Sequence, residues 1–151
     1  MLAKLKLIAP LLFLISCIVE TSTNTVYVVK NKTMHEVTLT LYDVNYGDSL
    51  PQVSESTVHI AVNNVFSQMY GDDTGSQLYR YPFGESTDSV IIIFDGSRKL
   101  IHRRNELNSY RNILNRENYV ERVSEDNNLT TYTYTYILTE EDYNSAVPLE
   151  K

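Results

Sequence analysis

The strictest constraint on the fold is the alternation of side chains in residues 129–138, which read Leu-Thr-Thr-Tyr-Thr-Tyr-Thr-Tyr-Ile-Leu. Tyr132, Tyr134, Tyr136 and Leu138 occupy every second position of this segment. A period of two is that of a β-strand, because successive side chains of a strand point to opposite faces. The segment is therefore predicted to be a strand with one tyrosine face and one threonine face.

Similar runs recur along the chain. Residues 90–94 are five successive apolar residues, which indicate a central strand covered on both faces. The Asp95-Gly96 pair that follows is a tight-turn signal and predicts a returning strand at 99–102. Further strands are predicted at residues 26–30, 35–42, 57–62, 65–70 and 119–123, the first two forming an antiparallel hairpin.

Helix signals are fewer. Leu107, Tyr110 and Leu114 are spaced to form one apolar stripe, which predicts a helix over residues 105–115. Thr139 resembles a helix N-cap, because three acidic residues follow it and suit the first helical turn. The segments predicted to be irregular are residues 43–56, 70–85 and 124–128.

Seven or eight short strands with turn signals between them predict a mostly β protein. The expected architecture is an antiparallel β-sandwich, immunoglobulin-like or transthyretin-like in the broad sense, with one short internal helix and a short C-terminal helical turn. A small barrel is the alternative.

The N-terminus has the composition of a secretory signal. Lys4 and Lys6 give it positive charge, and the apolar run up to Ile15 is shorter than the roughly 20 residues of a membrane-spanning helix. Leu14-Ile15-Ser16-Cys17 then resembles the lipobox of bacterial lipoproteins, with leucine three positions before the cysteine and a small residue one before it.

This resemblance implies that Cys17 is diacylated and becomes the new N-terminus after cleavage. It implies a signal peptide at residues 1–16, the lipidated cysteine and a tether at 17–24, and a single domain at 25–151. Ile18 in the second position implies sorting to the outer membrane. The chain as a whole resembles small Gram-negative envelope lipoproteins with one β domain. The alternatives are an ordinary signal peptide that contains a cysteine, or a buried thiol in a cytosolic protein.

Charge and cysteine content narrow the partners. Without Lys4 and Lys6 the chain has 11 basic and 19 acidic residues, a charge of about −8. This balance argues against nucleic acid and anionic membrane surfaces as partners. A lone cysteine cannot form an internal disulfide, which fits its use as an anchor.

No catalytic or metal-binding motif stands out. His35, His59 and His102 lie on separate predicted elements without the spacing of a zinc site. The chain contains neither a GxSxG nor an SxxK motif. The prediction is therefore a protein that is not an enzyme and holds neither a cofactor nor a metal.

Two aromatic groups are candidate binding sites. In residues 70–85, Tyr70, Tyr79 and Tyr81 form a possible sugar-stacking platform with Asp72 and Asp73 as polar partners. The same aspartates could supply oxygen ligands to calcium, although the segment lacks the spacing of a known calcium loop. The simpler interpretation is a surface loop whose aromatic rings cap the core.

The tyrosine row Tyr132, Tyr134 and Tyr136 is the second group. It is interpreted either as part of the core or as an interface, since tyrosine is frequent in both settings. Together these features predict a lipid-anchored, non-enzymatic interaction or structural accessory module that binds a protein of the envelope. A carbohydrate-binding accessory lipoprotein that uses the 70–85 loop is the alternative.

Overall fold

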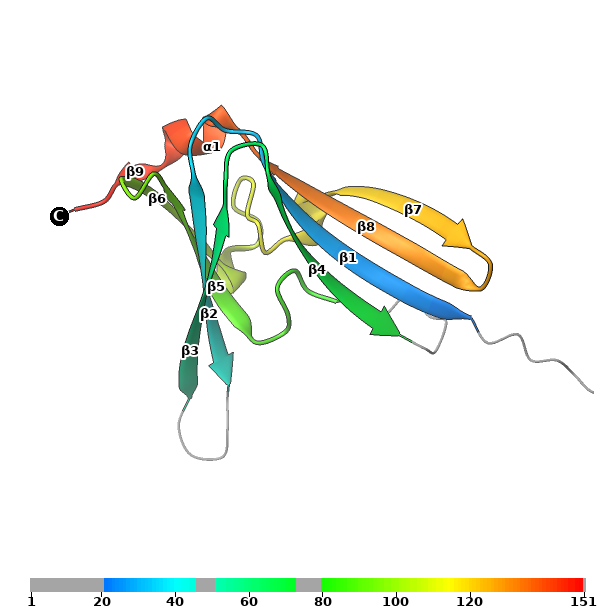
Figure 1. Cartoon of the computed structure of the whole chain (residues 1–151). Coiled ribbons are helices and arrows are strands. Elements are labelled where there is room, and N and C mark those ends of the chain that lie inside the picture. Colours follow the sequence, from blue (N-terminus) through cyan, green and yellow to red (C-terminus); the bar gives the residue numbers. More distant parts are fainter. Residues whose placement is uncertain (1–20, 46–50, 73–79, 151) are drawn as a thin grey trace, which may run out of the picture.

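The computed structural model describes residues 21–45, 51–72 and 80–150, and these residues form two β-sheets packed face to face (Figure 1). The first sheet has the strand order β4-β1-β8-β7 and the second has the order β3-β2-β5-β6-β9. The predicted mostly β sandwich is confirmed. The first two strands lie in different sheets, whereas the first two strands of an immunoglobulin constant domain share one.

The first sheet consists of β1 (Ser22–Asn31), β4 (Val65–Asp72), β7 (Val120–Asp126) and β8 (Leu129–Leu138). Its two central strands, β1 and β8, run parallel, so the expectation of a wholly antiparallel sandwich is corrected at this pair. Since β1 begins at Ser22, the predicted tether is also shorter than expected at its C-terminal end.

The second sheet consists of β2 (Val37–Asn45), β3 (Gln52–Ile60), β5 (Thr87–Phe94), β6 (Arg98–Arg103) and the two-residue β9 (Val147–Pro148). β5 lies at its centre, as predicted from its apolar run. Asp95 and Gly96, with φ of 46° and 60°, form the predicted turn between β5 and β6. β2 and β3 extend into residues 43–56, which were predicted to be a loop; residues 46–50 of that segment lie outside the described part.

The predicted hairpin between residues 26–30 and 35–42 is wrong, because β1 and β2 belong to different sheets. The side chain of the fully buried Asn31 holds the connection in place. It donates to the carbonyls of His35 at 2.8 Å and Ile60 at 3.1 Å, and it accepts from the backbone of Thr33 at 3.0 Å. These bonds fix the β1–β2 connection so that the chain crosses to the second sheet and does not pair β2 with β1.

The predicted helix over residues 105–115 is also wrong. The segment contains the 3₁₀ turn Arg104–Glu106 and further turns, and Arg111 has a left-handed φ of 52°. Asn112 explains the difference, because its buried amide donates to the carbonyls of Arg103 and Glu106 and accepts from Leu114. Asparagine side chains that bond nearby backbone groups compete with the helical ladder in this way.

A second 3₁₀ turn, Arg116–Asn118, precedes β7, and the C-terminal helix α1 is Glu140–Ser145. Thr139 caps α1 through a capping box with Asp142, as its sequence position predicted. The turn predicted at residues 124–128 contains fewer residues than expected, since β7 runs to Asp126. Figure 1 shows the two sheets close together at the end where α1 lies and diverging toward the other end.

The core lies between the inner faces of the sheets. Leu39, Val90, Ile92 and Phe94 supply the aliphatic half from β2 and β5, and they are fully buried. Tyrosines from β1 and β8 supply the aromatic half. The connection between β6 and β7 contributes Ile113 and Leu114, which are fully buried and fill space between the diverging sheets.

Candidate functional site

The predicted 70–85 site is only partly a loop. Tyr70, Gly71 and Asp72 belong to β4, so the irregular stretch begins later than predicted. Asp73 and Tyr79 lie outside the described residues, as does Cys17. The residues of this site whose surroundings are defined are therefore Tyr70, Asp72 and Tyr81.

Tyr70 points into the space between the sheets. Its ring packs edge-on against Tyr27, with 6.3 Å between centroids. Its hydroxyl is buried and has no hydrogen-bond partner among the described residues. Burial raises the pKa of Tyr70, with Arg80 opposing and Asp43 adding to that effect. Tyr70 therefore caps the open end of the core as a neutral phenol.

Tyr81 is packed beneath a guanidinium group. Arg104 lies 4.4 Å from the centroid of the Tyr81 ring, and it donates to the carbonyls of Thr87 at 2.6 Å and Gly84 at 2.8 Å. This arrangement fastens the segment from Tyr81 to Thr87 to the 3₁₀ turn Arg104–Glu106 that follows β6. One face of Tyr81 is thus covered, and the described rings of the segment do not form an open platform. Since Tyr79 is not described, the carbohydrate-binding hypothesis stays a prediction.

The tyrosine row of β8 forms part of the core. Tyr134 and Tyr136 are 2 % and 1 % exposed, and Tyr132 packs partly buried beside them. Tyr134 stacks on Tyr27 with 5.3 Å between ring centroids. The interface alternative is therefore wrong for Tyr134 and Tyr136, because a partner could reach these rings only if the sheets separated.

The three histidines occupy three separate places. His59 is an exposed residue of the edge strand β3. His102 is buried on β6, where its Nδ1 accepts a hydrogen bond from the backbone N–H of Ile113 at 3.1 Å. Within residues 21–45, 51–72 and 80–150, no group of three histidine, cysteine or acidic side chains is arranged to hold a metal ion.

His35 is the histidine with carboxylate neighbours. Its Nδ1 lies 2.5 Å from Asp95 Oδ2, and its Nε2 lies 3.6 Å from Glu140 Oε2. Its ring stacks on Tyr143 with 3.6 Å between centroids. A catalytic triad needs one imidazole nitrogen directed at a nucleophile. Both nitrogens of His35 face carboxylates, so neither is directed at a nucleophile. The cluster links the β1–β2 connection, the β5–β6 turn and α1.

The edges of the two sheets differ in how they are protected. β7 has four charged side chains among its seven residues, and β9 is two residues long and contains Pro148. β3 has Glu55 near its middle. Charges, prolines and short strands are the means by which proteins keep other strands from pairing with an edge.

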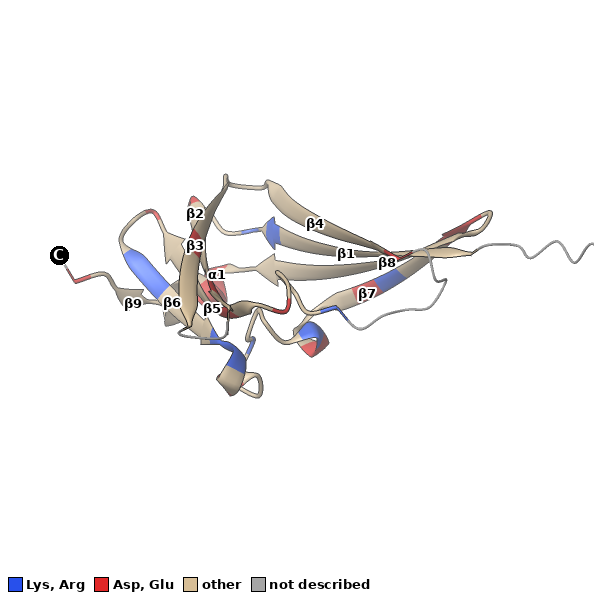
Figure 2. Cartoon of the chain, turned by 90° about the horizontal axis from the view of Figure 1, so that it is seen from below, with Lys and Arg blue, Asp and Glu red and all other residues tan. Residues whose placement is uncertain are grey.

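β4 lacks this protection. Within the described part of the chain it pairs with β1 alone, in a regular register without a bulge. Its first seven residues, Val65 to Gly71, carry no charge, and Asp72 ends the strand. Val65 and Met69 point outward and are 56 % and 66 % exposed. In Figure 2, β4 is tan along most of its length, whereas β7 carries red and blue bands.

β4 is thus the strand best suited to accept a partner strand, and we call it the open edge. The sequence predicted the strand but not its position at the border of a sheet. The run of uncharged residues between Val65 and Gly71 was the available signal. This uncharged run indicates an open edge only when the neighbours of the strand in the sheet are known.

Comparison with known proteins finds no matching family model, no matching curated protein and no matching solved structure. No helix among the described residues is long and apolar enough to cross a membrane.

Proposed function

We propose that this chain is a lipid-anchored, non-enzymatic protein of the outer envelope that acts as an interaction module, with β4 as its docking strand. The observation that supports docking is the regular open edge, which carries no charge before Asp72 at its end, whereas the other edges are protected. Strand addition supplies affinity through main-chain hydrogen bonds, and the outward side chains supply selectivity. The lipobox-like Leu14-Ile15-Ser16-Cys17 supports the anchor.

The open edge makes a specific prediction. Met69→Lys places a charge on an outward position of β4 that is already 66 % exposed, so the fold should tolerate it. Lysine on an edge strand disfavours the addition of a further strand, because the charged side chain loses part of its hydration against the outward side chains of the partner. We expect at least a tenfold loss of the protein partner recovered by crosslinking in intact envelopes.

Val123→Lys on β7 is the matched control, because Val123 is 51 % exposed on the edge that already carries charges. It should leave recovery unchanged. Circular dichroism of both variants checks that the sandwich is intact. If Met69→Lys and the parent recover the partner equally well, β4 is not the docking strand.

The anchor is tested separately by Cys17→Ala, which removes the sulfur that would carry the acyl chains. Stable attachment needs more than one acyl chain, and the variant cannot receive them at Cys17. It should therefore move from the membrane fraction to the soluble fraction. Incorporation of a labelled fatty acid should disappear with it. A variant that stays in the membrane fraction and still incorporates label would exclude Cys17 as the anchor.

A further inference from the structure

We propose that the strand that docks on β4 is the β4 of a second copy of this chain, paired antiparallel about a twofold axis at Gln68. This inference rests on the docking strand proposed above and names its occupant. The result is a continuous eight-stranded sheet in the order β7-β8-β1-β4-β4-β1-β8-β7. Its two outer edges are then the charged β7 strands, so pairing removes the unprotected edge of the first sheet from both copies.

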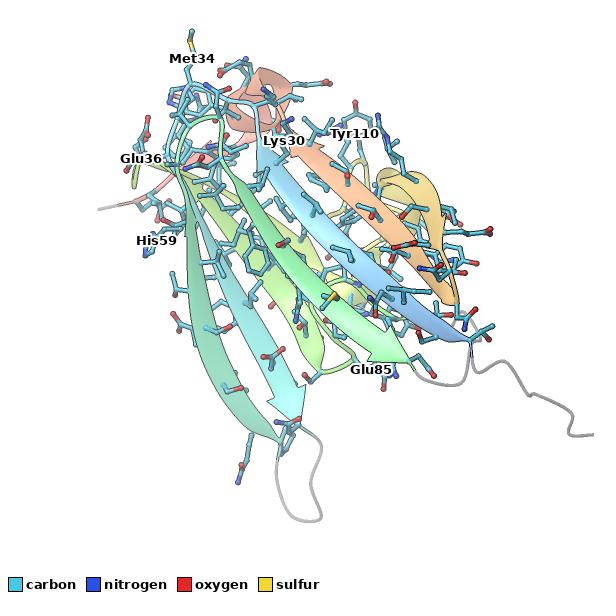
Figure 3. All side chains as sticks on the ribbon, turned by 45° about the vertical axis from the view of Figure 1, so that its right-hand side comes forward. Lys30, Met34, Glu36, His59, Glu85 and Tyr110 are labelled. Carbon is cyan, nitrogen blue, oxygen red and sulfur yellow. The ribbon has the colours of Figure 1, made fainter. Side chains whose placement is uncertain are left out.

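Charge favours the antiparallel direction. β4 begins beside two lysines: Lys30 is the register partner of Val65, and Lys32 Nζ lies 3.5 Å from Asn63 Oδ1. It ends at the acidic Asp72. Figure 3 shows Lys30 at the end of the sheet where β4 begins. Antiparallel pairing brings the acidic end of each strand near the basic end of the other, whereas parallel pairing would bring like ends together. Lys30 and Asp72 lie on opposite faces of the sheet, so this attraction acts between strand ends and not between directly opposed side chains.

The side-chain pattern allows only axes that pass through a residue, and axes at Gln68 and Met69 give the longest overlaps. Directly opposed residues of an antiparallel pair lie on the same face, so outward residues must meet outward residues. An axis at Gln68 satisfies this condition and overlaps seven residues of each β4. It places Ser67 opposite Met69 on the outer face and Phe66 opposite Tyr70 on the inner face. No position of this ladder brings two like charges together.

Gln68 provides an independent reason for this axis. Its Oε1 is buried and has no hydrogen-bond partner within the described ranges. An unsatisfied buried acceptor costs about 1–3 kcal/mol. With the axis at Gln68, the two Gln68 side chains lie directly opposite each other, so if both turn toward the interface the amide of one copy can donate to the oxygen of the other. The relation is reciprocal, as a twofold interface requires.

The anchor is compatible with this symmetry. β1 begins at Ser22, next to the C-terminal end of β4, since Thr23 pairs with Asp72. A twofold axis perpendicular to the sheet leaves the two Ser22 residues at the same height along that axis. One bilayer that lies parallel to the sheet can therefore hold both anchors. Attachment to a common surface raises the effective concentration of each copy for the other.

Cysteine crosslinking tests both partner and register. All seven strand pairings lie between Ser22 and Pro148, so a chain beginning at residue 18 contains the whole sandwich and no native thiol. Opposed residues of the ladder have Cα atoms about 4.5–5.5 Å apart, within disulfide range. Mixing Ser67→Cys chains with Met69→Cys chains should give a disulfide-linked dimer within minutes of mild oxidation.

The controls separate specific pairing from collision. Ser67→Cys alone should crosslink at least tenfold more slowly, because its diagonal position is farther away. Ser124→Cys, an exposed serine on β7, should not crosslink above that background. Sedimentation of the unmodified full-length lipoprotein in detergent should give twice the mass of one chain, and Met69→Lys should give one.

Two results would overturn the inference. One is a monomer in sedimentation together with no excess dimer in the Ser67 and Met69 mixture. The other is a thiol at Ser67 that crosslinks in envelopes to a different protein and not to a second copy. In the second case the docking strand stands and only its occupant is wrong. If Met69→Lys also fails to change partner recovery, the proposed function fails with the inference.

Discussion

Asp142→Ala is expected to destabilise the sandwich by about 3–4 kcal/mol. Asp142 is 4 % exposed and receives two parallel bonds of 2.8 Å from Nε and Nη2 of Arg111. It also accepts from the backbone and hydroxyl of Thr139. Removing the carboxylate breaks a buried ion pair and the helix cap at once. The side chain of Arg111 is 27 % exposed and can be partly hydrated, which keeps the loss at the lower end of the range for such pairs.

Glu141→Ala is the matched control, since Glu141 is the exposed neighbour of Asp142 in the first turn of α1. It should change the free energy of unfolding by less than about 0.5 kcal/mol. Urea unfolding at neutral pH, followed by circular dichroism, measures both variants. Equal stability of Asp142→Ala and Glu141→Ala would show that neither the ion pair with Arg111 nor the cap of α1 stabilises the fold.

Acidification from pH 7 to pH 4 is expected to remove about 3 kcal/mol of stability through His102 alone. Burial lowers the pKa of His102 from its ordinary value of 6.5 to about 4; Asp142 opposes this shift and Arg111 adds to it. The unfolded chain therefore binds a proton near pH 6.5, while the folded chain binds one only near pH 4. Stability is fully present above pH 6.5, falls as pH decreases between these values, and changes no further through this group below pH 4.

This pH window separates His102 from the carboxylates. Asp95, for example, has its pKa lowered from 3.8 by a hydrogen bond from His35, so its contribution to stability is lost only below that value. The measurement is urea unfolding at half-unit steps from pH 7.5 to pH 4. His102→Gln should unfold with a shallower pH dependence in this range, because the glutamine side chain does not titrate. An unchanged slope in His102→Gln would contradict the assignment.

Local patterns predicted the elements whose environment repeats along the chain. The bounds of β8 match the predicted strand, and β5, the Asp95-Gly96 turn and the Thr139 cap were also found where expected. Each depends on a period of two, a turn dipeptide or a cap, and these signals act over a few residues. The 105–115 helix failed because the three backbone bonds of the Asn112 side chain outweigh an apolar stripe of three residues.

By itself, the sequence determined that the chain is mostly β, that β8 has a tyrosine face, and that residues 14–17 resemble a lipobox. Only the tertiary structure decided that β1 and β2 belong to different sheets, that Tyr134 and Tyr136 are core residues, and that β4 is an edge while β8 is central. The physical reason is that strand periodicity reports which side chains share a face, but not which strand lies alongside. Pairing across distant segments is set by buried contacts such as those of Asn31 and Asp142, and those contacts exist only in the folded chain.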